Sequence, residues 1–222
     1  MRKWMIFLLC LCLLTPTVKA SEVKYVALTF DDGPSGRFTR RLLDGLEARQ
    51  AKATFLLCGY RLEQYPKEAQ RIFESGHEIG LHGYSHDDMG KMTQQQVIRE
   101  LEATLALLPE GCKPGFLRPP GGSSGKNVAL AAEALGIAIL NWSVDPRDWA
   151  VRDPVAVETA VLDEVQNGDV ILLHDMSDSS VDAALAIVDR LKAKGYRFVT
   201  ASELARLQGV TPVPGMLYNR FS

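Results

Sequence analysis

The stretch YVALTFDDGP, Tyr25 to Pro34, begins with an apolar run typical of a buried β-strand and ends in two adjacent aspartates, Asp31 and Asp32. Asp, Gly and Pro are common in turns, so a simple turn after the strand is one interpretation. Two neighbouring carboxylates also repel each other unless a cation lies beside them. The second interpretation is a metal site in which one carboxylate binds the ion while the other moves protons.

The rest of the chain alternates between strand-like and helix-like patterns with short connections. The pattern predicts strands at residues 25–30, 53–57, 78–82, 115–118, 137–142, 169–173 and 196–199. It predicts helices near 38–50, 65–75, 94–108, 127–135, 154–166, 181–194 and 202–208. Such repeats indicate an α/β fold around a parallel sheet, either open or closed into a barrel. The tail, 210–222, is expected to wrap the surface or to be loose.

Polar residues that can do chemistry follow the predicted strands. In parallel α/β folds the functional site lies at the C-terminal ends of the strands. The residues at that end are Asp31, Asp32, His82, His86, Arg118, Asp145, Asp148, His174 and Asp175. Turn residues scattered by chance would not gather on one edge, so the sequence predicts a site there.

Two histidines, His82 and His86, lie four residues apart in GHEIGLHGYSHDD, residues 76–88. This spacing can point two imidazoles at one cation, although two surface histidines would give the same pattern. With Asp32 as an oxygen ligand, the set becomes two histidines and one carboxylate, a common divalent-metal arrangement. His77 lies at the other end of its strand and is interpreted as structural.

The segment FLRPPGG, residues 116–122, places an arginine at the end of a strand and then restrains the backbone with two prolines. A surface arginine is the simpler interpretation. At this edge, however, the guanidinium of Arg118 could hold Asp31 ionised and oriented. The glycines that follow would let a backbone N–H approach a substrate closely.

Two later segments add candidates. NWSVDPRDW, residues 141–149, contains Asp148 and Trp149, and the indole could be either a core plug or a platform for the face of a sugar. DVILLHD, residues 169–175, delivers His174 from an apolar strand. A core histidine with satisfied hydrogen bonds is the usual explanation, whereas a histidine poised by an aspartate would be a general acid near neutral pH.

Together these five segments resemble the five motifs of the polysaccharide deacetylases, the NodB-homology carbohydrate esterases of family four. The match runs in order from Thr29 to His174, and TFDDGP is its most specific part. The resemblance implies a distorted, incomplete (β/α) barrel with about seven parallel strands, formed by a single domain at 21–222. It also implies one divalent metal ion, zinc or a similar ion such as cobalt.

The resemblance further implies a role for each motif residue at the metal side of the site. Asp31 would be the general base and Asp32 a metal ligand. His82 and His86 would complete the metal site, and Arg118 would position the base.

For the remaining motifs, the resemblance implies that Asp148 orients the general acid, His174. Trp149 and Leu172 would contact the substrate, with the leucine lining the acetyl pocket. The backbone N–H of Gly121 would stabilise the oxyanion.

Three positions depart from the family's usual pattern. Leu81 stands where Asn is frequent, Gly83 where Ser or Thr is frequent, and Gly121 where Tyr is frequent. The missing hydroxyl at Gly83 implies a lower metal affinity. The missing aromatic wall at Gly121 affects substrate preference more than chemistry.

Residues 1–20 have the layout of a secretory signal peptide, with Arg2 and Lys3 before an apolar run and a small residue, Ala20, at the expected cleavage point. We expect a secreted or periplasmic protein, with an uncleaved anchor as the alternative. This segment contains three basic side chains and no acid, so its removal changes the net charge from −2 to −5. That balance argues against nucleic acid or an anionic membrane as a partner.

Two cysteines, Cys58 and Cys112, lie outside the signal segment, and an exported protein could join them. Cys58 ends a predicted strand, whereas Cys112 precedes one, on the opposite edge of the sheet. A disulfide needs Cα atoms within about 7 Å of each other. The sequence therefore favours two free thiols.

The expected reaction is hydrolytic N-deacetylation of an N-acetylglucosamine polysaccharide, either peptidoglycan or a chitin-like polymer, with release of acetate. The alternatives are an O-deacetylase of acetylated xylan and a non-catalytic glycan-binding relative. A two-metal phosphoesterase is disfavoured, because the ligands suffice for one ion.

Overall fold

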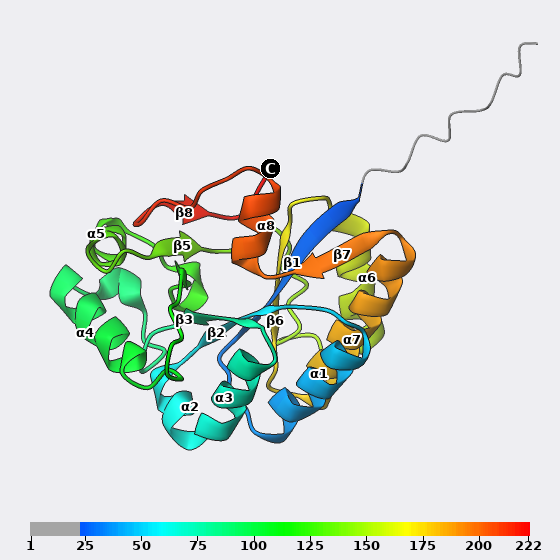
Figure 1. Ribbon diagram of the computed structural model, residues 1–222, viewed down its shortest axis with the longest axis horizontal. Helices are drawn as coiled ribbons and strands as arrows, with labels where there is room; N and C mark the ends of the chain where they lie inside the picture. Colours follow the sequence, from blue (N-terminus) through cyan, green and yellow to red (C-terminus); the bar gives the residue numbers. More distant parts are fainter. Residues whose placement is uncertain (1–22) are drawn as a thin grey trace, which may run out of the picture.

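The computed structural model describes residues 23–222, so the expected signal peptide lies outside the described residues and stays a prediction. Within them, helices pack around a curled sheet (Figure 1). The strands are β1 (Lys24–Asp31), β2 (Thr54–Leu57), β3 (Glu78–Leu81), β4 (Phe116–Leu117), β5 (Ala138–Leu140), β6 (Val170–His174), β7 (Tyr196–Val199) and β8 (Leu217–Tyr218). The helices are α1 (Arg37–Ala48), α2 (Gly59–Gln64), α3 (Pro66–Glu74), α4 (Gln94–Leu105), α5 (Lys126–Ala134), α6 (Pro154–Glu164), α7 (Asp178–Ala193) and α8 (Ala201–Leu207). Two short 3₁₀ segments are η1 (Met89–Lys91) and η2 (Pro120–Gly122).

The strand order is β6-β1-β2-β3-β4-β5-β8, and β7 pairs with the first half of β1. All pairs of named strands are parallel. After β5 the chain returns to β6, where Val144 forms a parallel bridge with Ile171. The sheet therefore curls into an incomplete barrel, which confirms the predicted α/β fold with about seven parallel strands.

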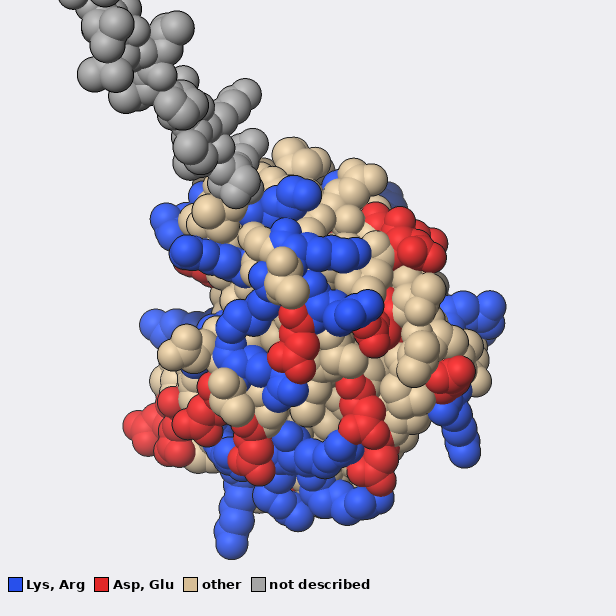
Figure 2. Space-filling model, turned by 90° about the vertical axis from the view of Figure 1, so that its right-hand side faces the viewer, with Lys and Arg blue, Asp and Glu red and all other residues tan. Residues whose placement is uncertain are grey.

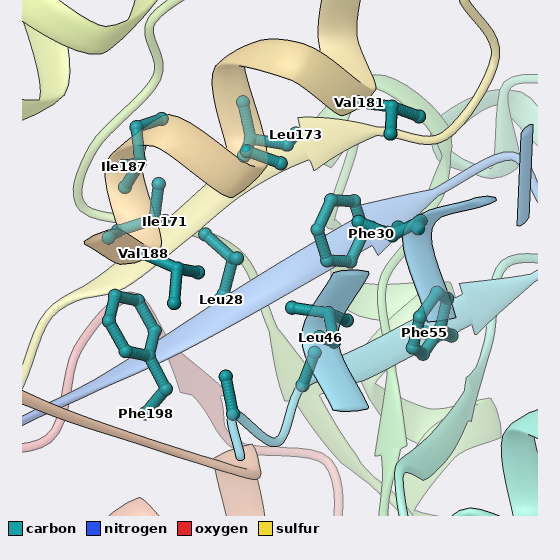
Figure 3. Close-up of a cluster of buried hydrophobic side chains, with 14 of the residues drawn as sticks. Leu28, Phe30, Leu46, Phe55, Ile171, Leu173, Val181, Ile187, Val188 and Phe198 are labelled. Carbon is teal, nitrogen blue, oxygen red and sulfur yellow. The ribbon is translucent and has the colours of Figure 1, made fainter. Parts of the chain in front are cut away.

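The main core lies between the sheet and helices α1 and α7. Alternate side chains of β1, including Leu28 and Phe30, pack into it, because successive residues of a strand point to opposite faces. Figure 3 shows them among Leu46, Phe55, Ile171, Leu173, Val181, Ile187, Val188 and Phe198. The residues between them on β1, Thr29 and Asp31, point to the other face, where the candidate site lies.

All seven predicted strands occur; one α-helix, α2, one strand, β8, and the two 3₁₀ segments were not predicted. Helix α7 begins at Asp178, three residues earlier than predicted, because Ser177 caps it by accepting a hydrogen bond from the N–H of Ser180. Strand β8 pairs with β5, and Phe221 beyond it is buried near Phe116. The tail therefore packs against the sheet and is not loose.

The face over α1, α6 and α7 carries charges of both signs close together (Figure 2). Several of its arginines pair with acids, as Arg49 does with Asp189 at 2.7 Å. Exposed pairs of this kind contribute little to stability. Within residues 23–222, the helices are all too short or too polar to cross a membrane. Cys58 and Cys112 are both free thiols, as the sequence favoured.

Candidate active site

The first aspartate of the pair, Asp31, is buried and held by an arginine. It is 3% exposed at the end of β1, and its Oδ1 accepts a hydrogen bond of 2.6 Å from Nη1 of Arg118. Its second oxygen, Oδ2, lies 3.8 Å from Nε2 of His82. The contact between arginine and aspartate expected from the sequence is therefore present, and one carboxylate oxygen remains free beside the histidines.

The guanidinium of Arg118 is completely buried, and all three of its nitrogens donate hydrogen bonds. Its Nε donates to the carbonyl of Leu140 and its Nη2 to the carbonyl of Asn141, both at 2.8 Å, while Nη1 also donates to the hydroxyl of Thr29 at 2.9 Å. Burial lowers the pKa of Arg118, and the charge and hydrogen bond of Asp31 oppose that effect. Because arginine stays protonated in proteins, this network fixes a positive charge at Asp31.

The second aspartate, Asp32, faces two imidazoles. Its backbone is left-handed, with φ of 70°. Its Oδ1 lies 3.3 Å from Nε2 of His82 and 3.1 Å from Nε2 of His86, and the three residues offer ligand atoms that all lie within 4.8 Å of one another. Among the described residues this buried oxygen finds no hydrogen-bond donor. A buried, unpaired carboxylate oxygen facing two imidazole nitrogens fits a divalent cation.

The two histidines are oriented differently. His82, directly after β3, is 2% exposed, and its Nδ1 donates to the carbonyl of Arg118 at 2.7 Å. This bond fixes the tautomer and leaves Nε2 available as a ligand. His86 has a left-handed backbone, φ of 68°, and its side chain is 43% exposed. Loop geometry, and not burial, therefore places His86.

The charges of the cluster are coupled. Burial raises the pKa of Asp32, but the two imidazoles outweigh burial and hold this pKa well below its usual range. Asp32 in turn raises the pKa of His86 through their contact, against the effect of burial. The carboxylate is thus ionised and available to a cation.

A second pair lies at the end of β6. Nδ1 of His174 donates to Oδ1 of Asp148 at 2.8 Å, and the backbone N–H of His174 donates to Oδ2 at 2.9 Å. Burial lowers the pKa of His174, but the hydrogen bond and charge of Asp148, with Asp31 and Asp32, outweigh it and raise the pKa to about 9. Nε2 of His174 lies 4.0 Å from Oδ2 of Asp32, so this pair reaches the metal cluster.

The predicted substrate contacts line one cavity with the cluster. Its volume is about 480 Å³, and its walls include Gly121, Trp142, Trp149 and Leu172. Gly121 has a left-handed backbone, φ of 61°, and an added Cβ would meet nothing within 4 Å, so the missing side chain leaves this wall open. A neighbouring cavity of about 600 Å³ shares Asp32, Trp149 and His174 with the first. Trp149 is 58% exposed and lies where the two meet.

Three other candidates make hydrogen bonds that stabilise the local fold. Asp145 lines the cavity, but its Oδ1 accepts from the N–H of Arg147 in a turn. Asp175 is completely buried. Its carboxylate accepts from the hydroxyl of Thr39 in α1, and its backbone carbonyl accepts from the hydroxyl of Ser35 in the loop after β1. His77 lies at the far end of β3, where its Nδ1 accepts a backbone N–H, as predicted.

Sequence reasoning missed two residues that contact the site. The hydroxyl of Thr29 accepts a hydrogen bond from the buried guanidinium. The ring centroid of Trp142 lies 5.6 Å from Cζ of Arg118, and Trp142 lines the cavity. The period-2 alternation that puts Asp31 on the inner face also puts Thr29 there, so that signal was in the sequence. The predicted strand at 137–142 included Trp142, but β5 ends at Leu140 and Trp142 lies in an irregular segment, where the alternation of a strand does not place a side chain.

The fold and site define a class of protein: an incomplete parallel barrel with a candidate site for a single metal ion at the C-terminal ends of its strands. Residues 19–140, more than half of the chain, match the family described as polysaccharide deacetylase. The chain is 37% identical over 188 residues to the peptidoglycan-N-acetylglucosamine deacetylase PgdA of Listeria monocytogenes, covering 84% of this chain and 40% of that protein.

Two further comparisons cover most of both partners. A peptidoglycan-N-acetylglucosamine deacetylase of Bacillus cereus is 36% identical over 189 residues, 82% of this chain and 89% of the relative. The solved family 4 acetyl xylan esterase of Clostridium thermocellum, in complex with a cobalt ion, has a TM-score of 0.82 at 33% identity, covering 89% of this chain and 98% of the esterase. The chain therefore belongs to the polysaccharide deacetylase family, and the resemblance seen in the sequence is confirmed.

Proposed function

We propose that this chain is a metal-dependent hydrolase that removes N-acetyl groups from an N-acetylglucosamine polysaccharide of the peptidoglycan or chitin type. The peptidoglycan deacetylases among its relatives support this substrate class. The observation that carries the proposal is that two adjacent aspartate carboxylates contact different groups. Asp31 is fixed by an arginine, whereas Asp32 faces two imidazoles, so one carboxylate can serve a cation and the other a proton.

Asp32, His82 and His86 would hold the metal ion. One oxygen and two nitrogen donors suit zinc, which we propose as the resident ion, and cobalt fits the same set. When bound, the ion would supply the Lewis acidity that activates a water molecule and polarises an amide carbonyl.

Asp31 acts as the general base. Its second oxygen, Oδ2, lies beside the ligand cluster, and Arg118 holds the carboxylate in one orientation. Asp31 accepts a proton from water as the water oxygen forms a bond to the carbonyl carbon of the acetamide. The backbone N–H of Gly121, on the cavity wall, stabilises the negative charge that develops on the carbonyl oxygen.

His174 acts as the general acid. Because Asp148 holds its Nδ1, the transferable proton is on Nε2, which points toward the cluster. As the C–N bond breaks, Nε2 donates this proton to the departing nitrogen. The products are acetate, which keeps the oxygen of the water, and a free amino sugar.

The cavity walls suit a sugar substrate. Leu172 is 4% exposed and can contact the methyl of an acetyl group, and the exposed indole of Trp149 offers a flat surface to a pyranose ring. We further propose that the protein acts outside the cytoplasm on a polysaccharide partner. The signal-like composition of residues 1–20 supports this location. The negative net charge of the remaining chain argues against nucleic acid or an anionic membrane as the partner.

The test is acetate and free-amine detection across defined glycans, with protein stripped of metal by a chelator and protein reloaded with zinc or cobalt. We expect equimolar acetate and amine from N-acetylglucosamine oligomers or peptidoglycan fragments, only after reloading. Equal activity of the stripped protein, or no product from any N-acetyl substrate, would contradict the proposal.

A second candidate activity is O-deacetylation of acetylated xylan, favoured by the likeness to the Clostridium thermocellum esterase. The same panel separates the two activities when it includes acetylated xylo-oligosaccharides. Acetate without free amine, from xylan substrates alone, would identify the esterase.

A further inference from the structure

We propose that Glu100, on helix α4, is a positioning residue that holds the loop between His82 and His86 in its metal-binding conformation. The inference rests on the metal site of the proposed function. It concerns a side chain that touches neither the cluster nor the cavity.

The carboxylate of Glu100 reaches the loop through a single oxygen. Its Oε2 accepts from the backbone N–H of Tyr84 at 2.9 Å, from the backbone N–H of Ser85 at 2.8 Å, and from the hydroxyl of Ser85 at 3.0 Å. Hydrogen bonds to an ionised acceptor are roughly twice as strong as neutral ones. Glu100 therefore binds the two residues that immediately precede His86.

The other side of the loop is also held. The carbonyl of Gly83 accepts from the N–H of Gly59 at 2.9 Å, and the carbonyl of Tyr84 accepts from the N–H of Tyr60 at 3.1 Å, both at the start of α2. Helix α2 binds the carbonyls, and Glu100 binds the N–H groups that point the other way. Removing the carboxylate would leave the loop held from one side only.

His86 depends on this support more than His82 does. His82 is buried and bonded to the carbonyl of Arg118, whereas the side chain of His86 is 43% exposed and its backbone is left-handed. A non-glycine residue with positive φ is strained and persists where its surroundings impose it. The bonds from Glu100 to the preceding residues provide that constraint.

Glu100 also bears on position 83, where this chain has a glycine and no side-chain hydroxyl. Gly83 has φ of 78°, and an added Cβ would lie 2.7 Å from the Cε of Met89, so a side chain there would be strained. The next two N–H groups are instead bonded by Glu100. In this chain, a carboxylate from α4 stabilises the metal loop without a hydroxyl at position 83.

The test measures metal affinity directly. Metal-free wild-type protein and the variants Glu100→Ala, Glu100→Gln and Glu102→Ala are titrated with Co²⁺ against a competing chelator, and the visible spectrum of the bound ion is recorded. Glu102 is exposed on the same helix, so Glu102→Ala is the control for losing one negative charge from α4. Thermal unfolding of the metal-free proteins reports whether each variant is folded.

We expect Glu100→Ala to bind Co²⁺ about 10- to 100-fold more weakly, the range typical of partners that orient metal ligands, with an altered spectrum. Glu100→Gln keeps an oxygen acceptor and should lose much less affinity, and Glu102→Ala should bind like wild type. Wild-type affinity in a folded Glu100→Ala, or equal losses in the Gln and Ala variants, would overturn the inference. If Glu100→Ala does not fold, Glu100→Met, which keeps the length of the side chain but has no oxygen acceptor, takes its place: a loss of tenfold or more supports the proposal, and wild-type affinity overturns it. Failure of the wild type itself to bind metal would instead refute the proposed function.

Discussion

Asp31 and Asp32 are neighbours in sequence with different surroundings, and that difference makes two identical side chains chemically distinct. Asp31 is bonded to a buried guanidinium, while Asp32 meets two imidazole nitrogens and no hydrogen-bond donor among the described residues. Like charges this close together need nearby positive charge. Arg118 provides it on one side, and the proposed cation provides it on the other.

Replacing Asp31 by Asn should remove the base and keep the metal site. We expect kcat to fall by about 10²- to 10⁴-fold, the usual contribution of a general base, with metal content unchanged. Acetate release and elemental analysis of the same preparation check both halves. Full activity in Asp31→Asn would exclude this residue as the base, and loss of metal would make it a ligand.

Replacing Asp148 by Asn should change the pH dependence through His174. The folded pKa of His174 is raised from 6.5 to about 9, so the charged pair stabilises the metal-free fold fully below pH 6.5 and this contribution is lost as pH rises to about 9. The difference in the free energy of unfolding between wild type and variant should therefore decrease between pH 6.5 and about 9. In turnover, the variant should lose activity at lower pH than wild type, because its general acid deprotonates earlier. Urea titrations and rate–pH profiles test both statements, and parallel curves would contradict them.

The motif residues could be predicted from the sequence, but their contacts could not. TFDDGP and the two spaced histidines predicted the candidate ligands, and the structure brings these three side chains together. They were predictable because metal binding restricts the residue types at those positions. The hydrogen bonds of Glu100 to the loop were not predicted, because they depend on how α4 packs beside that loop. The sequence also could not show which nitrogen of His82 is free, because that depends on the carbonyl of Arg118.

Arg118 joins three strand ends. It follows β4, bonds two residues of β1, and bonds two carbonyls at the end of β5, Leu140 and Asn141. The bond to Leu140 is buried and the bond to Asn141 is partly buried. A buried carbonyl left without a donor costs about 1–3 kcal/mol. The arginine therefore stabilises the same strand ends that carry the site.

Replacing Arg118 by Lys keeps the charge but loses the planar set of donors. We expect the free energy of unfolding to fall by on the order of 3 kcal/mol, because the carbonyls of Leu140 and Asn141 lose their donors. Chemical denaturation measures this, with Arg206→Lys on the surface as a control that should change by about 0.5 kcal/mol or less. An unchanged unfolding free energy in Arg118→Lys would show that the network is not structural.

Strong periodicity made the seven strands and seven of the helices predictable. Helix α2 has six residues and follows β2 directly, too short for a periodic signal. Strand β8 has two residues and exists because distant β5 offers a free edge. Sequence patterns report local preference, so elements made by long-range contacts are the ones missed.

Replacing Phe221 by Ala tests whether the C-terminal tail belongs to the fold. Phe221 is 1% exposed, its ring lies 6.1 Å from that of Phe116, and its N–H donates to the carbonyl of Gly168. We expect a loss of about 3–5 kcal/mol, as for other buried aromatic residues. Measured by denaturation, a change within about 0.5 kcal/mol would mean that the tail is dispensable.

The molecule as a whole brings segments far apart in the chain to one point. Asp32 follows β1, the two histidines follow β3, and His174 ends β6. The curl of the sheet brings the Nε2 atom of each histidine to between 3.1 and 4.0 Å from a carboxylate oxygen of Asp32. A parallel barrel does this because its strands all end at the same rim. An ion held there would link the loops after β1 and β3.

Anomalous diffraction from crystals grown with zinc or cobalt tests this arrangement most directly. We expect a single strong peak within direct coordination distance of Asp32, His82 and His86, with Asp31 close by but bonded to Arg118. A peak elsewhere, or none between these three side chains under conditions where the protein is active, would contradict it.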